Sequence, residues 1–225
     1  MSSPSPLEGA APHIRSLLTT LHKQSTTQES AITDADFESR TFDDVMRDKF
    51  IALDEDKSQY LYQLCRIINA KTVVEAGTSF GVSTIYLALA VSANVAATGG
   101  TGRVIATENE PTKAAKARDN WAQCGDVVTN VIDLREGDLR ETLKRDVEAV
   151  DLLLLDIWTP MALPTLKLIL PHMRYGAVVV ADNTISAAEK YKELLDFMRD
   201  PSSGFVNMTL PFSNGLEVSA YLPRQ

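Results

Sequence analysis

The sequence predicts an α/β fold in which helices cover both faces of a doubly wound, mostly parallel sheet. Short apolar runs alternate with helical patterns along the chain, as in sheets with right-handed crossover connections. One run, Asp151–Asp156, reads DLLLLD, and such a continuous apolar run belongs to a strand buried on both faces. Near the carboxyl end, Ser213-Asn214-Gly215 separates two strand-like runs and has the Asn-Gly signature of a tight hairpin. Because a hairpin is not a parallel crossover, the sheet should end with an antiparallel strand.

The bulk composition bounds the class of protein. The chain has 225 residues, a hydrophobic content of 44% and a formal net charge of −8. This length suits one α/β domain over residues 51–225 with a tail and helical extension over 1–50. The negative charge disfavours nucleic acid as a partner, and no apolar run approaches the ~20 residues that span a bilayer. The amino terminus lacks the basic and apolar regions of a secretory signal, so we expect a cytoplasmic protein with no membrane partner.

The two cysteines carry no metal or disulfide signal. Cys65 and Cys124 fall in helix-like patterns without CxxC spacing, which excludes a zinc site or disulfide framework. We expect both to be buried, reduced thiols.

Before the first strand, the sequence predicts two main helices. Residues 1–11 are rich in serine, proline and alanine, which favours disorder, and a helix over Pro12–Lys23 follows. Residues 25–48 are polar with Phe37 and Phe42, and we expect a short helix and a loop there. A second helix should start at the acidic residues 54–56, since negative charge stabilises a helix amino terminus.

The stretch Thr72–Ser83, TVVEAGTSFGVS, organises the rest of the chain. A β-branched run stops at Glu75, two glycines follow as Gly77-x-x-x-Gly81, and a long apolar helix pattern begins. Strand, acid, glycine turn and helix together are typical of a nucleotide-type cofactor site. Glycine suits a sharp turn or a close ligand, and the helix amino terminus presents free N–H donors.

Further strands and helices alternate to the carboxyl end. Strands are expected over 103–107, 130–134, 151–156, 177–181, 205–210 and 216–222, and helices over 111–125, 163–173 and 187–198. The glycine-rich loop Thr98–Gly102 follows a helix and precedes a strand. That is the edge of the sheet opposite to a cofactor site, so we interpret this loop as a turn.

Four acids fall at or next to the carboxyl ends of predicted strands: Glu75, Glu108, Asp156 and Asp182. Ligands of open α/β sheets bind at this edge. Glu108 suits a bidentate hydrogen bond to ribose hydroxyls, an arrangement that dinucleotide sites share. Any single acid here could instead be a helix cap.

Asp156, Asp182 and Asn183 also form a set of oxygen donors. Carboxylate and amide oxygens bind Mg²⁺ or Ca²⁺, and magnesium keeps several waters or substrate oxygens. The alternative is that Asp182-Asn183 only caps the following helix.

These residues resemble those of a known family. The series VVEAGTSFGVST, VIATE before a proline helix, EGD, LLLLDIW and VVVADN resembles class I S-adenosylmethionine-dependent methyltransferases. It is most similar to the catechol and caffeoyl-CoA type O-methyltransferases, over residues 50 to 222. The resemblance implies a Rossmann-like seven-stranded sheet with an antiparallel last strand.

The resemblance also implies roles for individual residues. Glu75, Gly77 and Gly81 would lie against the methionine part of the cofactor with Thr78 and Ser79, and Ser83 would contact its carboxylate. Glu108 would bind the ribose, while Asp138 and Trp158 would border the adenine. Asp156 would lie at both the cofactor and the metal, with Asp182 and Asn183 completing the metal ligands.

One departure concerns catalysis. Catechol-type members carry a lysine three positions after the metal-binding aspartate, where this sequence has Thr159. Threonine cannot replace the amine as a general base, so either the metal-assisted site of Asp156 acidifies the acceptor hydroxyl or the chemistry differs. Lys57, Lys190 and Lys192 are other candidates, but we expect each at the surface.

The leading hypothesis is therefore an S-adenosylmethionine-dependent O-methyltransferase that uses Mg²⁺ or a similar cation. Its acceptor would be a small hydroxylated molecule, an aromatic vicinal diol. The alternatives are a metal-independent O- or N-methyltransferase, a nicotinamide-dependent dehydrogenase and a non-catalytic cofactor-binding protein. The dehydrogenase fits poorly, because Gly77-x-x-x-Gly81 departs from G-x-G-x-x-G.

The resemblance says less about the acceptor and the assembly. It implies an acceptor pocket built from loops and from Phe37–Leu53. Phe80 and Tyr86 would line it or belong to the core. It further implies a homodimer, and the helix over Pro12–Lys23 would pack on the partner subunit.

Overall fold

The computed structural model describes residues 5–33, 45, 47 and 49–224. Phe37 and Phe42, with most of the predicted short helix and loop, lie outside these residues. In the described part, no helix is long and apolar enough to cross a membrane.

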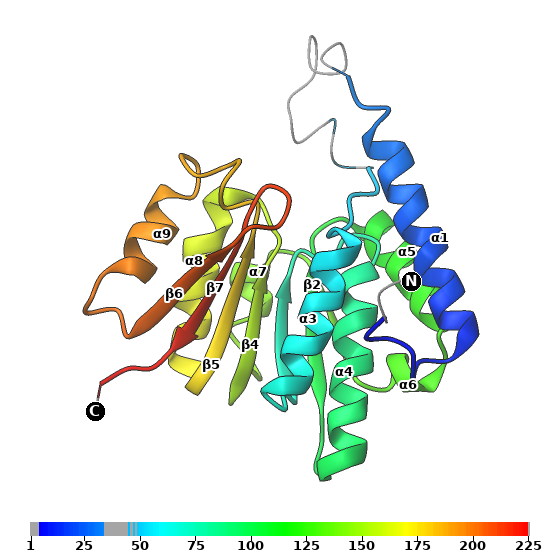
Figure 1. Ribbon diagram of the computed structural model, residues 1–225, viewed down its shortest axis with the longest axis horizontal. Helices are drawn as coiled ribbons and strands as arrows, with labels where there is room; N and C mark the ends of the chain where they lie inside the picture. Colours follow the sequence, from blue (N-terminus) through cyan, green and yellow to red (C-terminus); the bar gives the residue numbers. More distant parts are fainter. Residues whose placement is uncertain (1–4, 34–44, 46, 48, 225) are drawn as a thin grey trace.

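A seven-stranded sheet forms the centre of the molecule (Figure 1). Its spatial order is β3-β2-β1-β4-β5-β7-β6, with β1 to β5 parallel and β7 antiparallel to both β5 and β6. The predicted fold class is confirmed, and the antiparallel strand lies inside the sheet beside the edge strand β6. The strands are β1 (Thr72–Ala76), β2 (Arg103–Glu108), β3 (Ile132–Glu136), β4 (Val150–Leu155), β5 (Met173–Asp182), β6 (Phe205–Leu210) and β7 (Leu216–Tyr221).

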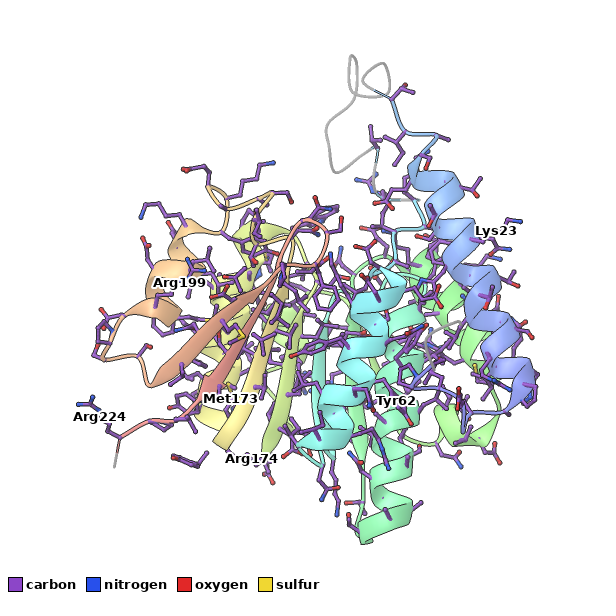
Figure 2. All side chains as sticks on the ribbon, in the orientation of Figure 1. Lys23, Tyr62, Met173, Arg174, Arg199 and Arg224 are labelled. Carbon is purple, nitrogen blue, oxygen red and sulfur yellow. The ribbon has the colours of Figure 1, made fainter. Side chains whose placement is uncertain are left out.

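Helices cover both faces of this sheet. Alternate strand residues face opposite sides, so Val73 packs into one core and Val74 into the other. The first core is shared with α1 (Pro12–Glu29), α3 (Glu55–Ile67), α4 (Val82–Thr98), α5 (Pro111–Ala122) and α6 (Asp126–Thr129). The second is shared with α7 (Leu139–Thr142), α8 (Thr159–Ile169), η2 (Leu170–His172) and α9 (Lys192–Arg199). Figure 2 shows side chains filling both layers.

Several predicted boundaries are wrong by half a turn or more. α8 begins at Thr159 instead of 163, because Pro160 is well accommodated in a first helical turn. α1 continues past Lys23 to Glu29, where the Ser25 hydroxyl donates to the Phe50 carbonyl oxygen at 3.0 Å. α9 begins only at Lys192. Tertiary contacts therefore extend or shorten helices that the local pattern predicts.

α1 uses its apolar face within its own chain. Ile14, Leu18 and Leu21 are buried in the first core. His22, on the same face, places its Nε2 3.0 Å from the hydroxyl oxygen of buried Tyr86 on α4. Burial lowers the pKa of His22, so the ring is neutral near pH 7. The expected homodimer, like the division at residue 50, stays a prediction.

The cysteines and the glycine-rich loop are as predicted. Cys65 and Cys124 are buried and free, and burial raises the pKa of Cys65 to about 12. The carbonyl oxygen of Gly99 accepts a hydrogen bond from Nζ of Lys71 at 2.6 Å. Lys71 is the residue just before β1. The loop is a turn at the amino edge of the sheet.

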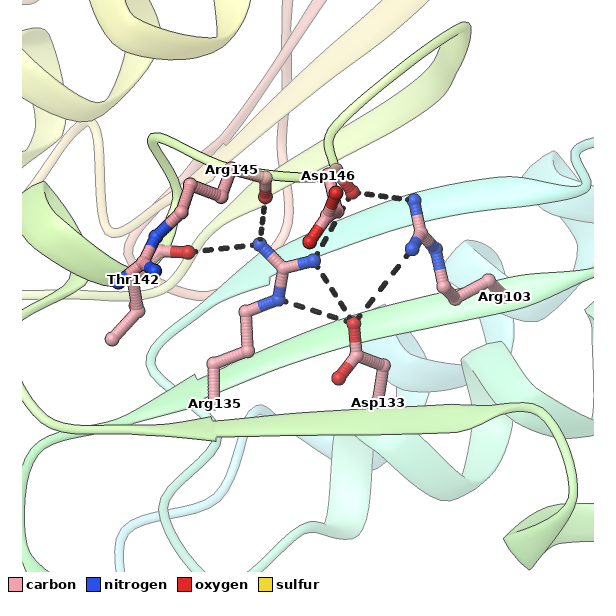
Figure 3. A pocket seen from close by; sticks show the side chains of 6 residues that line it. All are labelled: Arg103, Asp133, Arg135, Thr142, Arg145 and Asp146. Carbon is pink, nitrogen blue, oxygen red and sulfur yellow. Dashed lines mark hydrogen bonds and ion pairs between the residues drawn. The ribbon is translucent and has the colours of Figure 1, made fainter.

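A polar pocket lies between β2, β3 and the loop before β4 (Figure 3). The guanidinium of Arg135 donates to the carbonyl oxygens of Thr142, Arg145 and Asp146 and to the carboxylate of Asp133. These bonds use all five N–H donors of an arginine. The hydrogen bonds of Arg135 therefore hold β3 to the segment that precedes β4.

Replacing Arg135 by methionine should lower the free energy of unfolding by about 2–4 kcal/mol, because several polar groups lose their hydrogen bonds to Arg135. Arg118→Met is the control. Arg118 pairs with Glu136 at 2.5 Å, but half of its side chain is exposed, so its loss should cost under about 0.5 kcal/mol. Urea denaturation measures the free energy of unfolding of both variants. Equal losses would contradict the structural role of the Arg135 hydrogen bonds.

Candidate active site

The four strand-end acids meet at one edge of the sheet. Glu75 and Glu108 lie in β1 and β2, Asp182 ends β5, and Asp156 directly follows β4. The backbone N–H of Asp156 donates to the Ala76 carbonyl oxygen at 3.0 Å, so the ends of β1 and β4 are adjacent. The predicted gathering of these acids is present.

The glycine turn between β1 and α4 is shaped by the protein around it. Gly77 has φ +96°, and a Cβ there would lie 1.9 Å from the carbonyl oxygen of Asp156. Gly81 has φ +79°, and a Cβ there would lie 2.3 Å from Nε1 of Trp121. Close packing against β4 and Trp121 is thus enough to require both glycines, so their substitution does not test cofactor binding.

Glu75 is fully buried beneath this turn. Three hydroxyls donate to its carboxylate: Thr78 at 2.9 Å, Ser83 at 2.7 Å and Thr84 at 2.5 Å. Burial raises the pKa of Glu75, and the three hydroxyls oppose that rise. Thr78 and Ser83 were predicted to contact the cofactor. In the structure their hydroxyls donate to Glu75, and a contact with the cofactor stays a prediction.

Glu108 links the turn to β2. Its Oε2 accepts from the Ser79 N–H at 2.8 Å, and its Oε1 accepts from the Glu110 N–H at 2.9 Å. Burial raises the pKa of Glu108. Each carboxylate oxygen has a second lone pair, which leaves acceptors for a diol. Among the described residues, the buried Ser79 hydroxyl has no hydrogen-bond partner.

The two residues expected beside the adenine differ in environment. Asp138 caps α7 by accepting from the Arg140 N–H at 2.9 Å and pairs with the Arg140 side chain, so its carboxylate is already engaged. Trp158 is 43% exposed at the start of α8. An exposed indole after β4 can offer a face to a flat ring.

Lys57 corrects the prediction that it lies on the surface. Its side chain is 1% exposed, and Nζ lies 2.7 Å from Asp182 Oδ1 and 3.0 Å from Asp54 Oδ2. These carboxylates outweigh burial and raise the pKa of Lys57, which keeps it charged. The first turn of α3 therefore delivers an ammonium group to the end of β5. Lys190 and Lys192 are exposed, as expected.

The proposed metal donors are two carboxylates and one amide, Asp156, Asp182 and Asn183. The Asp156 carboxylate has no hydrogen bond or ion pair within the described residues, and burial and the charge of Asp182 raise its pKa well above the usual range. Asn183 adds an amide at φ +61°. The set holds only two carboxylates, and the described residues contain no group of three or more His, Cys, Asp or Glu that could hold a metal.

The carboxyl end of α1 approaches the same edge. Burial and the nearby charges of Asp54 and Asp182 raise the pKa of Glu29. Phe50 and Phe80 stack with ring centroids 4.4 Å apart. Tyr86 is 1% exposed and belongs to the core, so of the two aromatic residues considered for the acceptor pocket only Phe80 remains a candidate.

Three comparisons with known proteins bear on this site. The "Methyltransferase domain" family profile matches residues 74–184, from β1 to the end of β5. The catechol O-methyltransferase of Niastella koreensis is 30% identical over 60% of this chain and 59% of its own length. That of Mycobacterium tuberculosis is 31% identical over 60% of this chain and 58% of its own length. The chain thus spans about three fifths of the curated relatives it matches.

A solved structure supports the same fold. TomG, an O-methyltransferase of Streptomyces achromogenes crystallised with S-adenosylmethionine, has a TM-score of 0.68 at 18% identity, covering 90% of this chain and 98% of TomG. Residues 74–184 therefore match a methyltransferase domain, and the chain is similar to S-adenosylmethionine-dependent O-methyltransferases. The matched region includes the glycine turn and the four acids.

Local sequence signals could have found two features that were missed. His22 is four residues after Leu18, on the buried face of α1. Lys57 is four residues before buried Leu61 on the inner face of α3. Spacing predicts their burial, but their partners come from distant elements.

Proposed function

We propose that the protein transfers the methyl group of S-adenosylmethionine to a hydroxyl group of a small aromatic vicinal diol. The observation that carries the proposal is the edge of the sheet, where Glu108 binds the glycine turn after β1 and Asp156 and Asp182 lie at the ends of the next two strands, β4 and β5. The names of both curated relatives, catechol O-methyltransferase, support the acceptor class.

Different residues have different roles in the proposed reaction. The turn and Glu108 bind the cofactor, with Glu108 accepting from the ribose hydroxyls. Trp158 covers the adenine. Asp156, Asp182 and Asn183 would hold a divalent cation, which would lower the pKa of the acceptor hydroxyl. Binding both reactants in line is itself a large part of catalysis.

A metal-independent methyltransferase is the second candidate. One observation favours it: Thr159, three positions after Asp156, brings no amine. Exhaustive chelation separates the two. Loss of turnover that returns with Mg²⁺ supports the first candidate, and full turnover without metal supports the second. The assay should offer catechols, plain phenols and amines as acceptors.

Glu108→Gln should weaken S-adenosylhomocysteine binding by about tenfold or more, because a charge-assisted bond to the ribose is lost. Isothermal titration calorimetry measures the affinity. Glu136→Gln is the matched control, since Glu136 is the register partner of Glu108 on β3 and its side chain is 40% exposed. An unchanged affinity in Glu108→Gln would remove Glu108 from the cofactor site.

A further inference from the structure

Lys57 is a buried ammonium group at this edge that the proposed reaction leaves unexplained. Its side chain is 1% exposed and contacts Asp182, a proposed cation donor, and Asp54, which precedes α3. An unpaired lysine would not stay charged in such a place. The chain keeps it charged by surrounding it with carboxylates.

The charges around Lys57 can be counted. Asp54, Asp156 and Asp182 contribute three negative charges, and each acts electrostatically on the others. Lys57 contributes one positive charge, so the formal charge of this cluster is −2. Glu29 of α1 faces the cluster from outside, and buried Glu75 lies beside Asp156. Glu29 and Glu75 add to this negative charge, which a divalent cation would offset.

The contact also limits the geometry of Asp182. Oδ1 lies 2.7 Å from Lys57 Nζ. Asp54 holds the ammonium from its other side. The ion pair therefore restricts the orientation of the Asp182 carboxylate.

We propose that Lys57 is a positioning residue of the methyl-transfer site, which fixes Asp182 and sets the cluster charge that selects a divalent cation. This inference rests on the proposed function. It assigns to α3 a positive charge that Thr159, three positions after Asp156, does not supply. The charge acts through Asp182 and not by contact with the acceptor.

The proposal predicts opposite effects from two substitutions. Lys57→Met changes the cluster charge to −3, so Mn²⁺ should bind about tenfold more tightly. Turnover should fall about tenfold, because the excess negative charge disfavours an ionised acceptor. Asp54→Asn changes the charge to −1 and should weaken Mn²⁺ binding about tenfold. Lys57→Arg, which retains the charge, should keep Mn²⁺ affinity close to that of the unaltered protein.

The measurement is Mn²⁺ titration of the S-adenosylhomocysteine complex by calorimetry, beside turnover with a catechol. Lys192→Met, at an exposed lysine of α9, is the control and should change neither. If Lys57→Met and Asp54→Asn both weaken Mn²⁺ binding, the role of Lys57 is only structural and the proposal is overturned. Absence of Mn²⁺ binding to the unaltered complex also overturns it, while leaving methyl transfer intact. Absence of S-adenosylhomocysteine binding would overturn the proposed function itself.

Discussion

Replacing Gly77 by alanine is expected to lower the free energy of unfolding by about 3 kcal/mol or more. Two effects add. Alanine is strained at φ +96°, and its Cβ would lie 1.9 Å from the carbonyl oxygen of Asp156. That oxygen belongs to the backbone of the segment that follows β4. The clash can therefore be relieved only if β1 and β4 separate at the active-site edge. For a chain of this length, the midpoint of thermal unfolding should fall by roughly 6–12 °C.

Gly137→Ala separates the two effects. Gly137 has a similar φ of +106°, but a Cβ there would meet nothing within 4 Å. This control should cost only the backbone strain, about 1–2 kcal/mol. Differential scanning calorimetry on both variants gives the difference that belongs to the clash. Equal losses would mean that the turn has room beside Asp156, and a ligand would then be needed to explain Gly77.

Replacing Asp156 by asparagine is expected to reduce kcat/KM by about a hundredfold or more while leaving the fold intact or more stable. The carboxylate has no bonded partner among the described residues, and it is repelled by Asp182 and Glu75. Removing a charge that neighbouring carboxylates repel relieves that repulsion. The proposed reaction, however, needs that charge to hold a cation. Function and stability therefore oppose one another at this position.

Steady-state kinetics and thermal unfolding measure the two sides of this prediction. S-adenosylhomocysteine affinity should change by less than about tenfold, since the cofactor is bound chiefly by the turn and Glu108. Asp119→Asn, at an exposed acid of α5, should leave both measurements unchanged. An Asp156→Asn variant that retains full turnover would contradict the metal-assisted reaction and favour the metal-independent alternative.

Much of the architecture follows from local pattern. The four buried leucines between Asp151 and Asp156 predict β4 because only a strand covered on both faces tolerates such a run. The Asn-Gly turn predicts the β6–β7 hairpin because its left-handed backbone matches the twist of paired strands. The helix predicted to begin at 163 begins at Thr159, where Pro160 fits the first helical turn.

The sequence by itself determined the order of the strands and helices along the chain, the glycine turn, and the acids that close four strands. These depend on residue spacing and on backbone preference, which are local. Only the tertiary structure decided what each acid contacts. Glu75 accepts from hydroxyls of the turn beneath which it lies, and Glu108 clamps that turn to β2. Lys57 reaches Asp182 across 125 positions of the sequence. Strand order and helix packing decide which charges meet at the edge of a sheet. No local sequence pattern encodes a contact between residues so far apart in the chain.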